Sequence, residues 1–134
     1  MYPHFIEPVL RLVGPGVFSF TLVMALLNCL AFASIYRFLA RETADELLAF
    51  LGLATVLFFG YVASRVWLHD LFLQYHPLRM LFPALSLPVV RAFAHGPTPR
   101  RGALLSALGA AAFLWNPDSG AIVLASAFLL LVYD

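Results

Sequence analysis

The segment VFSFTLVMALLNCLAFASIY, residues 17–36, contains twenty consecutive residues without a charged side chain. The hydrocarbon core of a bilayer is about 30 Å thick, and an α-helix crosses it with about 20 mainly apolar residues. Inside lipid, every backbone polar group must find its hydrogen bond within the segment, which a helix achieves. Residues 17–36 therefore predict a transmembrane helix and a helical membrane fold.

The composition of the whole chain supports this class. Of its 134 residues, 63% are hydrophobic and 11% are charged, whereas soluble domains have about 45–50% apolar and about 25% charged residues. Eight arginines and no lysine stand against seven acids, so the chain lacks the basic field that binds nucleic acid. We predict an all-α, polytopic integral membrane protein with about 4–5 membrane helices, and no nucleic acid among its partners.

Further apolar runs lie on both sides of this segment. Pro83 and Pro88 fall inside one run, and two prolines in one membrane helix predict a kink or a break. The last two runs have only about 12–13 apolar residues, so short or re-entrant helices are expected. As a single transmembrane helical unit, residues 1–134 are predicted to contain an interfacial segment at 1–16 and helices near 17–36, 47–64, 78–93, 103–115 and 120–133.

Two polar features inside or between these runs have structural interpretations. Asn28 lies near the middle of the first span, where an amide side chain usually hydrogen-bonds a neighbouring helix. The connector at residues 37–46 ends in Thr43-Ala44-Asp45-Glu46, which offers a helix N-cap with acids in the first turn of the run that follows. Both features are therefore expected to stabilise the fold.

The arginines predict an orientation. The connectors at residues 37–46 and 91–101 contain five arginines, and the opposite side of the membrane contains three. Because cytoplasmic loops carry an excess of basic residues, the first set is expected to be cytoplasmic. The cytoplasmic set is Arg37, Arg41, Arg91, Arg100 and Arg101, and the outer set is Arg11, Arg65 and Arg79.

Two polar breaks are then predicted to emerge together on the outer side: RVWLHDLFLQYHPLRMLFP at residues 65–83 and WNPDSG at residues 115–120. His69 and Asp70 fit a general acid/base couple, since imidazole titrates near neutral pH. Their spacing matches no metal-binding pattern, so no metal is expected. A solvated interface remains the alternative interpretation of this stretch, because Trp67 and Tyr75 indicate the headgroup level, where polar residues need no binding role.

Arg79 follows Pro77 at the predicted start of a helix, where a forked guanidinium and outward-pointing amides suit a phosphate. An ion pair of Arg79 with Asp70 or Asp118 is the alternative. Asp118 lies in Asn-Pro-Asp-Ser-Gly, a pattern typical of a structural turn in which Gly120 takes a positive φ. No catalytic residue is assigned and no cofactor is expected. The candidate substrate-binding residues are Arg65, His69, Asp70, His76, Arg79, Asn116 and Asp118.

The two breaks also stand in a recognisable order. The chain starts with tyrosine and proline, continues with LVGPG and a long span, and then carries QYHPLRMLFPAL at residues 74–85 and LWNPDSG at residues 114–120. In this order, these stretches resemble part of the GT-C-type polytopic membrane glycosyltransferases of bacteria. Such enzymes are transferases that use polyprenyl-phosphate-linked sugars at the outer face of the membrane.

The resemblance implies a multi-pass protein of the bacterial inner membrane whose ligands include membrane lipids and a polyprenyl-phosphate sugar. The catalytic acid of these enzymes usually lies in an external loop upstream of a segment like YPHFIEPVLRLVGPG, and this chain contains no such loop. We therefore expect the sequence to be an internal portion of a longer enzyme that lacks the usual base.

Two other classes remain open. A small noncatalytic membrane subunit, packed against other membrane helices or a larger complex, also explains short helices and few charges. A transporter fragment would use broken helices and intramembrane acids, but no acid falls at mid-bilayer in the predicted segments. Stable copurification with a larger protein would favour the subunit.

Overall fold

The structure is a computed structural model that describes residues 3–14, 16–63, 66 and 76–133. In these residues every regular element is helical, which confirms the all-α prediction for this part of the chain. The elements are α1 (Pro3–Val13), α2 (Val17–Thr43), α3 (Glu46–Leu57), the π-helical segment η1 (Phe58–Ala63), α5 (His76–Ala94), α6 (Pro99–Trp115) and α7 (Pro117–Tyr133).

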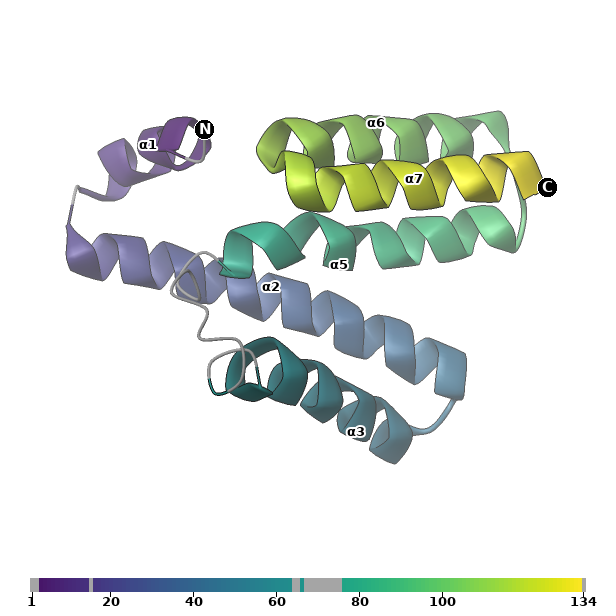
Figure 1. Cartoon of the computed structure of the whole chain (residues 1–134), viewed down its shortest axis with the longest axis horizontal. Helices are drawn as coiled ribbons and strands as arrows, with labels where there is room; N and C mark the ends of the chain where they lie inside the picture. The colour runs from purple at the N-terminus through teal and green to yellow at the C-terminus, as the bar shows by residue number, and fades with distance from the viewer. Residues whose placement is uncertain (1–2, 15, 64–65, 67–75, 134) are drawn as a thin grey trace.

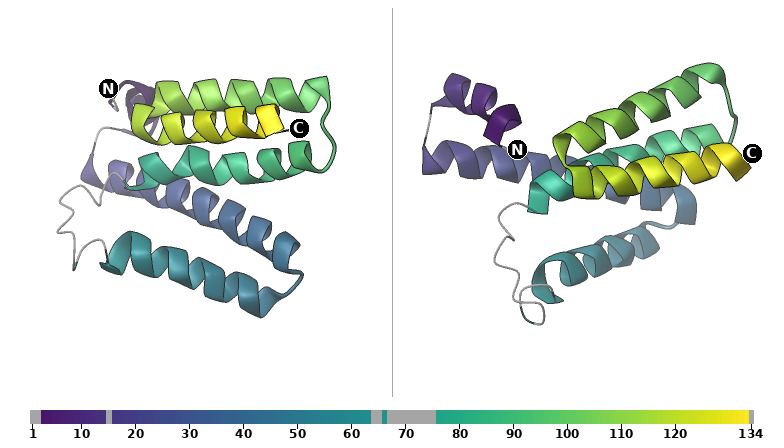
Figure 2. Two further views of the ribbon diagram at one scale, coloured as in Figure 1. Left: turned by 45° about the vertical axis from the view of Figure 1, so that its right-hand side comes forward. Right: turned by 45° about the horizontal axis from the view of Figure 1, so that its top comes forward.

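The long helices lie roughly side by side in layers (Figures 1 and 2). Helix α2 packs between α3 and α5, and the hairpin of α6 and α7 packs on the other side of α5. The amphipathic helix α1 folds back beside the start of α2, where Leu10 joins a small core around Met24 and Leu78. Helix α1 lies within the segment predicted at residues 1–16, and the interfacial position of that segment stays a prediction.

In the described part of the chain, three helices are long and apolar enough to cross a membrane: Val17–Thr43, Glu46–Ala63 and Pro77–Ala94. The chain is therefore a helical membrane protein by the length and composition of its helices. Helices α6 and α7 have 17 residues each, or about 26 Å at 1.5 Å per residue. They are longer than the predicted 103–115 and 120–133, and they reach the lower limit of a membrane span.

The helix ends differ from the predicted ones for local reasons. Helix α2 continues past residue 36 to Thr43, because RFLARET contains no glycine or proline and consists largely of good helix formers. It stops where Ala44 takes a left-handed conformation with φ of 51°. Helix α6 starts at Pro99 because Thr98 accepts a hydrogen bond from the Arg101 amide and proline suits the first turn.

Helix α5 runs continuously through Pro83 and Pro88, so the predicted break is wrong. Pro88 has no N–H to donate to the carbonyl of Ala84, four residues earlier. The hydroxyl of Ser34, on α2, donates to that carbonyl oxygen at 2.8 Å. A neighbouring helix therefore satisfies the group that proline leaves open, as the membrane interior requires.

Polar and small residues hold α2 against its other neighbours. The Tyr61 hydroxyl donates to Oδ1 of Asn28 at 2.8 Å, which confirms the interhelical role predicted for Asn28. Within residues 43–46, the stretch predicted to offer an N-cap, Asp45 is the cap of α3 and accepts hydrogen bonds from the amides of Leu47 and Leu48. Ala31 on α2 and Ala84 on α5 are almost fully buried and belong to one core cluster, so these two helices meet through small residues.

Candidate functional site

The start of α5 meets the turn between α6 and α7. The indole Nε1 of Trp115 donates to the backbone oxygen of Leu78 at 2.8 Å, and the Trp115 ring lies against Phe82 with ring centroids 5.5 Å apart. Residues from the two predicted polar breaks are therefore neighbours. We call this region the junction and define it as Leu78, Arg79, Trp115, Asn116 and Asp118.

Asn116 fixes the turn at the junction. Asn116 is fully buried, with 0% of its surface exposed. Its side-chain oxygen accepts from the Asp118 amide at 3.1 Å, and its backbone oxygen accepts from the Gly120 amide at 2.8 Å. Asn116 thus occupies the N-cap position of α7, which supports the structural interpretation of the turn.

Gly120 serves a different purpose from the predicted one. It lies inside α7, and Gly14 is the glycine with a positive φ among the described residues. A Cβ placed on Gly120 would lie 2.2 Å from the Cα of Phe113 on α6. Glycine is needed here because the two backbones of the hairpin approach closely, not because of its conformational freedom.

Arg79 and Asp118 remain as the charged members of the junction. Arg79 is partly buried, and its Nε is buried without a hydrogen-bond partner in the described part of the chain. Asp118 is exposed in the first turn of α7. The ion pair considered between them is not formed: the salt bridges among the described residues join Arg11 to Glu7 and Arg91 to Glu42.

The structure places only some of the predicted site residues. Arg79 belongs to the first turn of α5, Asn116 joins α6 to α7, and Asp118 belongs to the first turn of α7. The start of α5 and the turn between α6 and α7 lie at the same end of the helix layers (Figure 1). His76 is the first residue of α5. Arg65, His69 and Asp70 lie outside the described residues. The shared outer cluster is therefore supported by the meeting of the two breaks and is otherwise still a prediction.

A groove of about 330 Å³ lies beside the junction. It runs between α2, η1 and the start of α5, and its walls are mostly apolar. Its lining residues are Phe20, Thr21, Met24, Ala25, Asn28, Tyr61 and Pro77. The groove meets the junction through Met24, which lines it and belongs to the same core cluster as Leu78.

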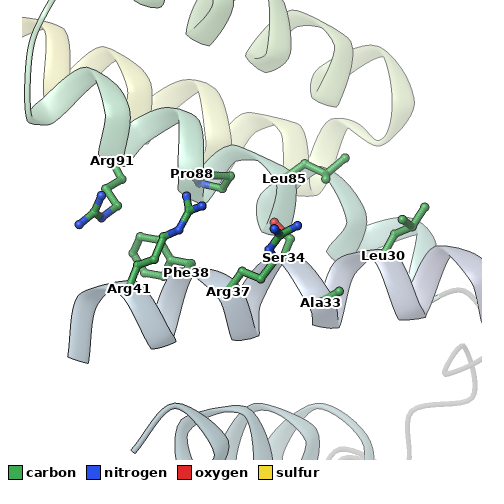
Figure 3. A pocket seen from close by; sticks show the side chains of 9 residues that line it. All are labelled: Leu30, Ala33, Ser34, Arg37, Phe38, Arg41, Leu85, Pro88 and Arg91. Atoms are coloured by element: carbon green, nitrogen blue, oxygen red, sulfur yellow. The ribbon is translucent and has the colours of Figure 1, made fainter. Parts of the chain in front are cut away.

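A second pocket, of about 340 Å³, lies at the opposite end of α2 and α5 (Figure 3). Arg37 and Arg41 extend from α2 toward α5, and Arg91 comes from α5 itself. Ser34 is the other polar residue of the lining, and the apolar lining residues are Leu30, Ala33, Phe38, Leu85 and Pro88. We call this region the arginine pocket.

Sequence reasoning assigned these arginines to a cytoplasmic connector and missed the pocket. The signal was the spacing of Arg37 and Arg41, since residues four apart share one face of a helix. That spacing carries information only if α2 continues beyond residue 36, as it does in the structure. Among the described residues, no group of three or more His, Cys, Asp and Glu side chains is arranged to hold a metal ion.

Scans against protein-family models, curated proteins and solved structures find no match to this chain. The chemistry of the junction and of the arginine pocket is therefore the basis for a functional assignment.

Proposed function

We propose that this chain is a portion of a membrane glycosyltransferase-like protein, and that its junction contributes to binding a polyprenyl-phosphate-linked sugar at the outer face of the bacterial inner membrane. The observation that carries this proposal is the hydrogen bond from Trp115 to Leu78, which joins the two polar breaks. The order of the sequence stretches supports the family, and the junction supports a headgroup site.

The phosphate is assigned to Arg79 and the first turn of α5. Arg79 is the fourth residue of that helix, whose free N-terminal amides and dipole favour an anion. A guanidinium can make two parallel charge-assisted hydrogen bonds to a phosphate. The buried Nε of Arg79 has no other described partner, so binding would satisfy a group that is costly to leave open.

The polyprenyl chain is assigned to the apolar groove beside the junction. Met24 contributes to this groove and also belongs to the core that contains Leu78. An isoprenoid chain lying there would bury apolar surface while its phosphate stays near Arg79. Trp115 is assigned to the headgroup zone of the bilayer, where tryptophan is enriched in membrane proteins.

The proposal covers binding and not the catalytic step. Asp118 is the one carboxylate of the junction, and its place in the first turn of α7 already suits the helix dipole. In the glycosyltransferases that the chain resembles, the catalytic acid usually lies in an external loop, upstream of a segment like residues 2–16. Any transfer reaction would need residues outside the junction.

The proposal includes a topology. Helices α2, α3 with η1, and α5 cross the bilayer, and the 17-residue helices α6 and α7 form the fourth and fifth membrane segments. Residues 37–46 and 94–102 face the cytoplasm, and the junction faces outward.

The test is binding of a polyprenyl phosphate to the purified chain in nanodiscs, with wild type, Arg79→Lys and Arg79→Ala compared. Loss of a charge-assisted contact should weaken binding about tenfold in the lysine variant and more in the alanine variant. Asp118→Asn should fold normally. Arg11→Ala is the matched control, because Arg11 is exposed and paired with Glu7 on α1. Equal binding by wild type and Arg79→Ala would reject the site.

A noncatalytic membrane subunit is the second candidate. It is favoured by the large apolar side chains that α6 and α7 leave exposed, namely Leu104, Phe113, Leu114, Ile122, Phe128 and Leu129. A partner helix would cover these faces in a complex, whereas lipid covers them otherwise. Retention of a larger membrane protein through affinity purification in mild detergent would favour this candidate.

A further inference from the structure

The arginine pocket has no role in the function proposed for the junction. It lies at the other end of α2 and α5, where the carboxyl-terminal parts of both helices meet (Figure 3). Its three arginines come from two helices that are distant in sequence. The pocket therefore exists only because α2 and α5 pack together.

The charges of the pocket are not balanced by the groups around it. Arg91 pairs with Glu42 through its Nε. Arg37 and Arg41 are exposed and make no hydrogen bond or ion pair within the described residues. Among the described residues, the guanidinium groups of Arg37 and Arg41 are thus left without an anion.

The pocket is also polar at one end and apolar at the other. Leu30 lies seven residues before Arg37, or about 10 Å along the helix, inside the uncharged stretch of the first span. Leu85 and Pro88 form the facing wall on α5. The hydroxyl of Ser34 is already donated to Ala84. A lipid with a charged headgroup has the same arrangement, since its headgroup would face the arginines and its acyl chain would face the apolar lining residues.

We propose that the arginine pocket binds the phosphate headgroup of an anionic phospholipid, with Arg37 and Arg41 on the phosphate and one acyl chain along Leu30 and Leu85. Arginine forks make paired hydrogen bonds to phosphate oxygens. Basic pockets between membrane helices on the cytoplasmic side are suited to such headgroups. A free phosphate ion shares the same chemistry at the rim but leaves the apolar wall unused.

The test uses native mass spectrometry of the purified full chain in detergent, titrated with phosphatidylglycerol or with phosphatidylcholine of the same acyl chains. The wild type is expected to bind phosphatidylglycerol about tenfold more tightly, and Arg37→Gln with Arg41→Gln should remove that preference. Arg100→Gln is the matched control, because it removes an exposed arginine from the same end of the molecule without touching the pocket.

Glu42→Gln separates a binding role from a folding defect. It frees Arg91 from its ion pair, so a third guanidinium becomes available and phosphatidylglycerol should bind several-fold more tightly. A variant that only damaged the fold would bind less. This gain of affinity is the outcome that a purely structural role of the arginines does not produce.

Three results would overturn the proposal. The first is an unchanged lipid preference in the double variant, and the second is an equal loss in Arg100→Gln, which would show a diffuse surface charge. The third is displacement of the lipid by an equal concentration of inorganic phosphate, which would show a site for a free anion. Retained lipid under added phosphate supports the lipid assignment.

Discussion

The two ends of α5 differ in how their polar groups are paired. At its start, neutral groups satisfy one another, since the Trp115 indole donates to the Leu78 carbonyl and Asn116 caps α7, and a single arginine, Arg79, keeps a buried Nε without a described partner. At its end three arginines gather, and among the described residues only Arg91 has an acidic partner. A polar residue at a membrane boundary is thus not evidence of a site by itself. The informative feature is a donor that the fold leaves unoccupied.

The largest expected effect tests whether the two ends lie on opposite sides of the membrane. In a Cys29→Ala background, Asp118→Cys should react with an impermeant reagent added to intact cells. Thr43→Cys and Arg100→Cys should be protected, because both belong to the connectors that the arginines assign to the cytoplasm. All three positions are exposed. The reverse pattern would invert the topology, and labelling of all three would show that the ends share one side.

The second prediction concerns the packing at the junction end. Gly120→Ala should destabilise the chain strongly, by about 1–3 kcal/mol or more, because the new Cβ would lie 2.2 Å from the backbone of Phe113. A thermal melt in detergent measures the loss. Gly16→Ala is the control, since nothing lies within 4 Å of a Cβ at that position. Equal melting temperatures for the two variants would mean that the hairpin is loose.

The third prediction removes the contact that joins the two breaks. Trp115→Phe keeps an aromatic ring beside Phe82 and deletes the donor to Leu78. We expect a loss of about 0.5–1.5 kcal/mol, the usual net value of one hydrogen bond. Denaturant unfolding in mixed micelles provides the measurement. No change in stability would remove the main support for the junction.

The smallest effect is expected at the charged end. Arg91→Gln breaks the pair with Glu42, whose side chains are 32% and 38% exposed. A partly exposed ion pair of this kind contributes about 0–1 kcal/mol, less than the packing around Gly120. The same unfolding assay applies. A loss larger than that of Trp115→Phe would reverse the comparison between the two ends.

The sequence was sufficient for the class of fold and for the pairing of helix ends. Uncharged runs near 20 residues force helices in lipid, and alternating connectors place Trp115 at the same end as Arg79. Capping rules also placed a helix N-cap within residues 43–46, but they did not single out Asp45, which accepts from the amides two and three positions later.

Three features of the structure depend on tertiary contacts and could not be predicted from the sequence. The continuity of α5 depends on Ser34, a residue 50 positions before the carbonyl it satisfies. The need for glycine at position 120 depends on Phe113 of the facing helix. The arginine pocket required both the extension of α2 and its packing against α5. None of these distances is encoded in hydropathy or in local propensity.

The bond from Ser34 to Ala84 has a consequence for biogenesis. A helix that enters the bilayer by itself must satisfy its backbone polar groups internally. In α5 the Ala84 carbonyl has no intrahelical donor, because Pro88 lacks an N–H. The Ser34 hydroxyl that donates to this carbonyl belongs to α2, and Ser34 is synthesised fifty residues earlier than Ala84. Entry of α5 into the bilayer is therefore expected to be coupled to docking on α2, and Ser34→Ala should slow membrane insertion of α5 in a cell-free assay even where the finished protein tolerates the change.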